Sequence, residues 1–136
     1  MAVCQQLGIE NELIPRIATP FAGGMARTGE VCGAVVGALM CIGIKHGRDE
    51  VGQSEDKAQG LGGALIRLFR EEMGSLNCRE LTGFDLSTPE GVKQFLSSDV
   101  PVKVCLRAVG FTYETVLGLL QQPIGSSLPY GGVQRG

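Results

Sequence analysis

The residues of this sequence that are most able to do chemistry are its five cysteines, Cys4, Cys32, Cys41, Cys78 and Cys105. A cysteine thiolate acts as a nucleophile, ligates soft metals and forms disulfides. No Cys-X-X-Cys pair occurs, which argues against a zinc ribbon or a thioredoxin-type motif. An odd number of widely spaced cysteines is also a poor disulfide framework, so we expect thiols used in redox chemistry, in metal binding or in core packing.

Cys78 has the most reactive local setting. Asn77 is a good helix N-cap, and Glu80 completes a pattern that resembles a capping box. This pattern predicts that Cys78 is the first residue of a short helix, close to unpaired N–H groups and to the cation of Arg79. Both features lower the pKa of a thiol. The alternative is an inert, buried thiol.

The apolar segment 29–45 predicts a buried central helix that carries two further cysteines. Thr28 is its expected N-cap, so Cys32 lies in the first turn or two, where the helix dipole favours a thiolate. Cys41 follows nine residues later and, at ~100° per residue, falls on the opposite face. We therefore expect that Cys32 and Cys41 do not share a site, and that Cys41 is a core residue.

The remaining candidates are weaker. Cys105 lies on the inward stripe of a helix predicted over 102–120 and, taken alone, indicates core packing. Cys4 lies near the start of the sequence and is a weak candidate for a functional residue. His46, the single histidine, follows the central helix and is expected to cap its C-terminus. The lack of a second histidine argues against a zinc hydrolase or a haem with two histidine ligands.

The elements that must position these cysteines are helices. Strand patterns are nearly absent, and we predict an all-α fold, a bundle of about five helices around the Gly/Ala-rich central helix, about 29–45. The segments predicted to be helical are 1–8, 10–19, 29–45, 54–73, 88–96 and 102–120. We expect a single domain over residues 1–120 and a flexible tail over 121–136, which is rich in Gly, Pro and Ser.

Within the central helix, Gly29, Gly33 and Gly37 recur every four residues. Such a ridge lets a neighbouring helix come close, and we expect close packing to explain it. The alternative is that these small residues leave space for a cofactor. The same surface could also serve a homodimer.

Composition excludes several classes of protein. The net charge is −2 and no basic cluster occurs, which argues against binding to nucleic acid or to an anionic membrane surface. The longest apolar run, residues 31–44, would span only about 21 Å as a helix, less than the ~30 Å of a bilayer core. No secretory signal is recognised, and we expect a cytoplasmic protein without a membrane span.

Two segments resemble the redox-active C_GCAxxG_C_C family. They are GGMARTGEVCGAVVGALMCIGIKHG, residues 23–47, and NCRELTGFDLSTPEG, residues 77–91, and the resemblance extends over about 5–120. It implies that Cys32, Cys78 and Cys105 match three of the four cysteines for which the family is named. The first family cysteine would precede Met1, because Cys4 lies too close to Leu7 to match it. We expect a shortened chain, a misassigned start or a three-cysteine variant, each without a four-thiolate set.

The resemblance implies a function for Cys32, Cys78 and Cys105. The family is similar in part to split-Soret cytochromes, which implies that these cysteines hold an iron–sulfur cluster or form a reversible disulfide. We therefore predict a redox-active protein whose substrate and redox partner are unknown. The alternatives are a helical accessory or interaction module with structural cysteines and a zinc-binding scaffold.

Overall fold

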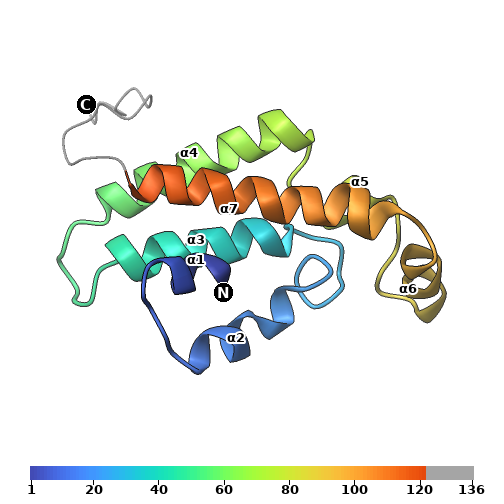
Figure 1. The fold of residues 1–136 in the computed structure, drawn as a ribbon, viewed down its shortest axis with the longest axis horizontal. Helices are drawn as coiled ribbons and strands as arrows, with labels where there is room; N and C mark the ends of the chain where they lie inside the picture. The colour runs from blue at the N-terminus through green and yellow to red at the C-terminus, as the bar shows by residue number, and fades with distance from the viewer. Residues whose placement is uncertain (122–136) are drawn as a thin grey trace.

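Three long helices carry the fold of this protein, for which a computed structural model describes residues 1–121 (Figure 1). They are α3 (Gly33–His46), α4 (Asp56–Met73) and α7 (Arg107–Leu120), and each packs against both others. Within residues 1–121 no helix is both long enough and apolar enough to cross a bilayer. The prediction of an all-α bundle is confirmed. The predicted tail lies outside the described residues, apart from Gln121.

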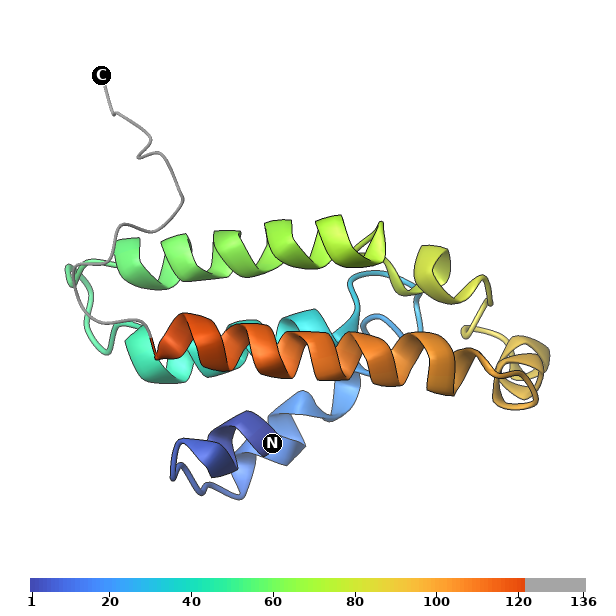
Figure 2. The same cartoon turned by 45° about the horizontal axis from the view of Figure 1, so that its top comes forward.

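Shorter elements surround this three-helix layer. The helices α1 (Ala2–Gln6) and α2 (Leu13–Ala18) and the 3₁₀ turn η1 (Thr19–Phe21) lie on the side of α3 and α7 that faces away from α4 (Figure 2). At one end of the bundle lie α5 (Cys78–Thr82) and α6 (Pro89–Leu96). A π-helical segment, η2 (Pro101–Leu106), leads directly into α7.

The core forms where the apolar stripe of α4 meets α3 and α7. Leu61, Leu65 and Phe69 recur every four residues on one face of α4, and all three are buried. Phe69 is completely buried against Val35 of α3 and Ala108 of α7. Burial of a ring of this size stabilises the fold by roughly 1.5–3 kcal/mol. This part of the core agrees with the helical pattern read from the sequence.

The start of the central helix differs from the prediction. The helix begins at Gly33 rather than Gly29, and Cys32 is its N-cap. Thr28 does not cap it, because the Thr28 hydroxyl donates instead to the carbonyls of Gly24 and Met25 at 3.0 and 2.7 Å. The preceding chain is occupied by a turn that the sequence pattern did not indicate.

That turn, residues 23–27, is left-handed. Its five φ values lie between 52° and 69°, and three of them belong to Met25, Ala26 and Arg27. Each non-glycine residue in this conformation costs roughly 1–2 kcal/mol. Backbone hydrogen bonds close the turn, from Ala26 N–H to the Pro20 carbonyl at 2.6 Å, from Gly29 N–H to the Gly23 carbonyl at 3.1 Å and from Glu30 N–H to the Gly24 carbonyl at 3.0 Å. The surrounding structure thus holds a conformation that the residues themselves disfavour.

The exposed Ala26 offers a direct test of this strain. We expect Ala26→Gly to raise the free energy of unfolding by about 0.5–1 kcal/mol, because removing the Cβ relieves more strain than the glycine adds in chain entropy. As a control, Ala58→Gly in α4 is expected to lower it by about 1 kcal/mol. Urea unfolding measures both. Equal destabilisation by the two substitutions would contradict the left-handed turn.

Candidate functional site

The candidate site is built on a short backbone pairing between residues 29–32 and 76–79. Val31 and Asn77 form an isolated antiparallel bridge at its centre. Three hydrogen bonds join the segments: Cys32 N–H to the Leu76 carbonyl at 2.8 Å, Cys78 N–H to the Glu30 carbonyl at 2.7 Å and Arg79 N–H to the Gly29 carbonyl at 3.1 Å. This pairing places the N-terminus of α3 beside that of α5, and therefore Cys32 beside Cys78.

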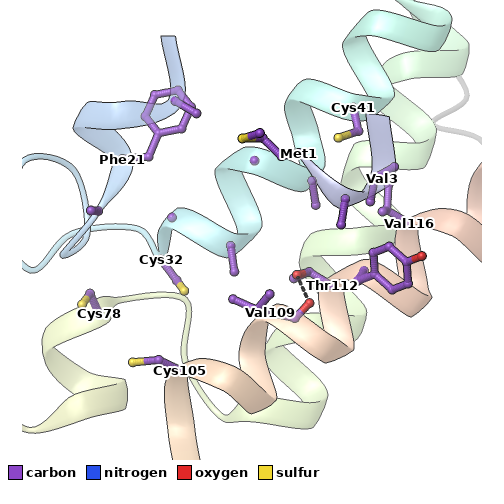
Figure 3. A pocket seen from close by; sticks show the side chains of 18 of the residues that line it. Met1, Val3, Phe21, Cys32, Cys41, Cys78, Cys105, Val109, Thr112 and Val116 are labelled. Carbon is purple, nitrogen blue, oxygen red and sulfur yellow. Dashed lines mark hydrogen bonds between the residues drawn. The ribbon is translucent and has the colours of Figure 1, made fainter. Parts of the chain in front are cut away.

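The three predicted cysteines are brought together. Cys32 caps α3, Cys78 is the first residue of α5, and Cys105 lies on η2. Their side chains point toward one another at one end of a pocket (Figure 3). Cys78 is buried, Cys32 and Cys105 are half-buried, and all three are free thiols. We call these three residues the cysteine cluster.

The pocket extends from the cysteine cluster along α3 to α1, with a volume of about 520 Å³. Small residues of α3 form one wall, and Val109, Thr112 and Val116 of α7 form another (Figure 3). Among the described residues that line it there is no acidic side chain, no lysine, no arginine and no histidine. A cavity of this size and apolar character is typical of a small-molecule site.

The glycine ridge serves two purposes. A Cβ on Gly33 would lie 2.6 Å from the carbonyl oxygen of Phe21, so close approach of η1 requires glycine there, as expected. A Cβ on Gly37 would meet nothing within 4 Å, because this residue faces the pocket. Close packing therefore does not explain Gly37. The alternative, that a small residue leaves space, describes it better.

The cysteine cluster has a distinct electrostatic character. Burial raises the pKa of the Cys78 thiol above its ordinary value, and the neighbouring Cys32 and Cys105 raise it further. Burial, and next Cys32, raises the pKa of Cys105. The prediction of a lowered pKa for Cys78 is therefore wrong, because burial outweighs the end of a short helix. Arg79 does not help, since its guanidinium pairs with Asp85 at 2.7 Å.

The local structure before Cys78 also differs in detail. Asn77 is the N-cap of α5, as predicted, but its side chain makes no capping hydrogen bond. Glu80 does not complete a capping box, because its carboxylate accepts a hydrogen bond from the Ser75 hydroxyl. The Ser75 hydroxyl oxygen in turn accepts from Asn77 N–H at 3.0 Å. The position of Cys78 as the first residue of the helix was thus predicted correctly, but the hydrogen-bond partners of Asn77 and Glu80 were not.

Cys41 lies at the other end of the same pocket (Figure 3). The prediction that Cys41 and Cys32 lie on opposite faces of one helix is wrong, because Cys32 precedes the first helical residue, Gly33. Cys41 is buried, as expected, and its Sγ lies 3.9 Å from the Sγ of Cys4. The sequence analysis gave Cys4 little weight, and nothing in the spacing indicated this contact.

The cysteine cluster is a poor fit for a metal centre as it stands. Within residues 1–121 no three histidine, cysteine, aspartate or glutamate side chains are arranged so that they could hold a metal ion. An iron–sulfur cluster usually takes four thiolates, and only three cysteines converge here. The residues present therefore do not fit a cluster in this arrangement.

The contact between the left-handed turn and Cys78 can be tested by a pair of substitutions. A Cβ on Gly24 would lie 2.5 Å from both the Cys78 Cβ and the Glu30 carbonyl oxygen. We expect Gly24→Ala to cost about 2 kcal/mol or more and to speed native-state alkylation of Cys78, because overpacking and a positive φ add. Gly37→Ala, which faces open space, is expected to be neutral or to stabilise α3 by up to about 1 kcal/mol.

Urea unfolding and mass-spectrometric alkylation rates provide the two readouts. If both substitutions had the same effect on stability, the turn would not lie against Cys78.

Comparison with known proteins identifies the family of this chain. The family model described as "Putative redox-active protein (C_GCAxxG_C_C)" matches residues 1–119. No curated protein and no solved structure matches the chain. Because the match spans most of the sequence, including all three cysteines of the cluster, the chain belongs to the C_GCAxxG_C_C family.

Proposed function

We propose that this protein carries out thiol–disulfide redox chemistry with Cys32, Cys78 and Cys105. The observation that carries this proposal is the convergence of three thiols, from three separate segments of the chain, at one end of a pocket without acidic, lysine, arginine or histidine side chains. Membership of a family described as redox-active supports it. A reversible disulfide needs only two sulfurs, whereas a cluster needs a fourth ligand that these residues do not supply.

We assign the attacking thiolate to Cys32, which is half-buried at the edge of the pocket. Cys32 attacks one sulfur of a disulfide substrate, and the other sulfur leaves as a thiolate. Cys105 then attacks the Cys32 sulfur and displaces the second half of the substrate. The substrate disulfide gains two electrons and becomes two thiols, which take up the protons released by Cys32 and Cys105. The protein retains a Cys32–Cys105 disulfide.

The electrostatics of the cluster favour this order. Burial first, and then charge on Cys32, raises the pKa of Cys105. When Cys32 enters a mixed disulfide its charge disappears, so Cys105 ionises more readily at the step where it must attack. Cys78 is the most buried of the three, and because burial and the neighbouring Cys32 and Cys105 raise its pKa, we assign it to the protonated form.

Disulfide mapping tests the proposal. Treatment of the reduced protein with a small aromatic disulfide is expected to join Cys32 to Cys105 at the cluster, a link located by proteolysis and mass spectrometry. Cys105→Ala should accumulate a mixed disulfide on Cys32, and Cys32→Ala should abolish the reaction at the cluster. Cys4→Ala, the matched control at a cysteine that does not line this pocket, should leave the reaction at the cluster unchanged.

Two results would count against thiol exchange. One is a native protein in which Cys32, Cys78 and Cys105 all resist alkylation and oxidation, as the accessory-module alternative requires. The other is a brown protein that, purified without oxygen, contains stoichiometric iron and loses it when any one of the three cysteines is replaced.

The pH dependence of alkylation tests the coupling between the thiols. Because the thiolate is the reacting form, we expect the rate at Cys105 to rise with a midpoint above that of an ordinary thiol. In Cys32→Ala the midpoint should move to lower pH, since a neighbouring negative charge has been removed and no charged side chain lines the pocket. An unchanged midpoint would show that the two thiols do not interact.

The similarity to split-Soret cytochromes, which the family resemblance implies, stays a prediction. The cytoplasmic location and the homodimer, which were predicted from the residues, stay predictions as well. We propose that a homodimer, if formed, does not use the face of α3 that carries Gly33 and Gly37, since that face lines the pocket.

A further inference from the structure

A second pair of cysteines lies apart from the cluster. Cys4 on α1 and Cys41 on α3 have their Sγ atoms 3.9 Å apart, and both residues are at most 5% exposed. The bond length of a disulfide is about 2.0 Å, so the two sulfurs must approach each other by about 2 Å to be joined. The two sulfurs face one another directly, with no other group between them.

The helix that carries Cys4 is the most easily displaced part of this contact. α1 has five residues and buries only Val3 and Cys4. A helix held by so few buried residues opens at low free-energy cost. α3, in contrast, has fourteen residues and packs against both α4 and α7. Opening of α1 would expose both thiols to a small reagent without disturbing the rest of the fold.

We propose that Cys4 and Cys41 are a second redox-responsive pair, oxidised by low-molecular-weight disulfides to a cross-link between α1 and α3. On opening, the Cys4 thiolate attacks one sulfur of the small disulfide and expels one thiolate. Cys41 then attacks the Cys4 sulfur and expels the second. Two protein thiols are oxidised, one small disulfide is reduced to two thiols, and the two protons pass to those thiols.

The pair is independent of the cysteine cluster. Between Gly33 and Cys41 the helix α3 rises by about 12 Å, which is too far for direct exchange with Cys32. Burial, and next the Cys4 thiol, raise the pKa of Cys41 to about 11. The docked Cys41 thiol is therefore protonated and slow to react, which makes opening of α1 the controlling step. Because α1 also lines the pocket through Ala2 and Val3, oxidation would fix that wall.

The test uses the whole chain and oxidised glutathione. After acid quenching, alkylation and trypsin digestion, Cys4 lies in peptide 1–16 and Cys41 in peptide 28–45. We expect these two peptides to be disulfide-linked, with fragmentation locating the link at Cys41 rather than Cys32. The link should persist in Cys32→Ala and vanish in Cys41→Ala. The oxidised protein should melt several degrees above the reduced one, and Cys41→Ala should lack that shift.

Failure of this inference is distinct from failure of the proposed function. A disulfide at the cluster links peptide 28–45 to peptide 104–107, which carries Cys105. Complete alkylation of Cys4 and Cys41 after oxidation would overturn the second pair, whatever happens at the cluster. A link from peptide 1–16 to peptide 71–79, which carries Cys78, would overturn it as well.

Discussion

The antiparallel backbone pairing of residues 29–32 with 76–79 is the constraint on which the arrangement of the cysteines depends. Helix packing alone places α3 beside α4 and α7 but does not fix what precedes Gly33. Three backbone hydrogen bonds fix the path of this segment, and each contributes on the order of 1 kcal/mol. Together they also set the antiparallel direction of the two paired segments. Because only main-chain atoms take part, the side chains of Cys32 and Cys78 are left free to point into the pocket.

A pocket lined mainly by apolar side chains gives two of its thiols particular properties. Burial raises the pKa of Cys78 and of Cys105, and the neighbouring thiols raise both further. These two thiols therefore stay protonated to higher pH than isolated cysteines do. A disulfide carries no charge. Its formation in such surroundings therefore avoids the free-energy cost of burying a thiolate anion.

Short-range sequence patterns correctly predicted the features that depend on interactions between residues close together in the chain. The apolar stripe of α4, the N-cap of α5 and the all-α class follow from periodicity and capping residues. The family resemblance identified Cys32, Cys78 and Cys105, which the structure brings together, whereas local sequence alone gave an equivocal reading for each. The features that were missed all depend on contacts between distant segments. The left-handed turn, the π-helical start before α7 and the contact of Cys4 with Cys41 have no local sequence pattern that requires them.

The origin of the cysteine cluster in three widely separated parts of the chain has a consequence for biosynthesis. Cys105 is synthesised long after Cys32, and contacts between such distant residues form late in folding. A nascent or partly translated polypeptide therefore contains thiols but no assembled site. Any oxidant that meets it encounters unorganised cysteines and can join the wrong partners. Oxidation before the last helix has docked would therefore compete with assembly of the cysteine cluster.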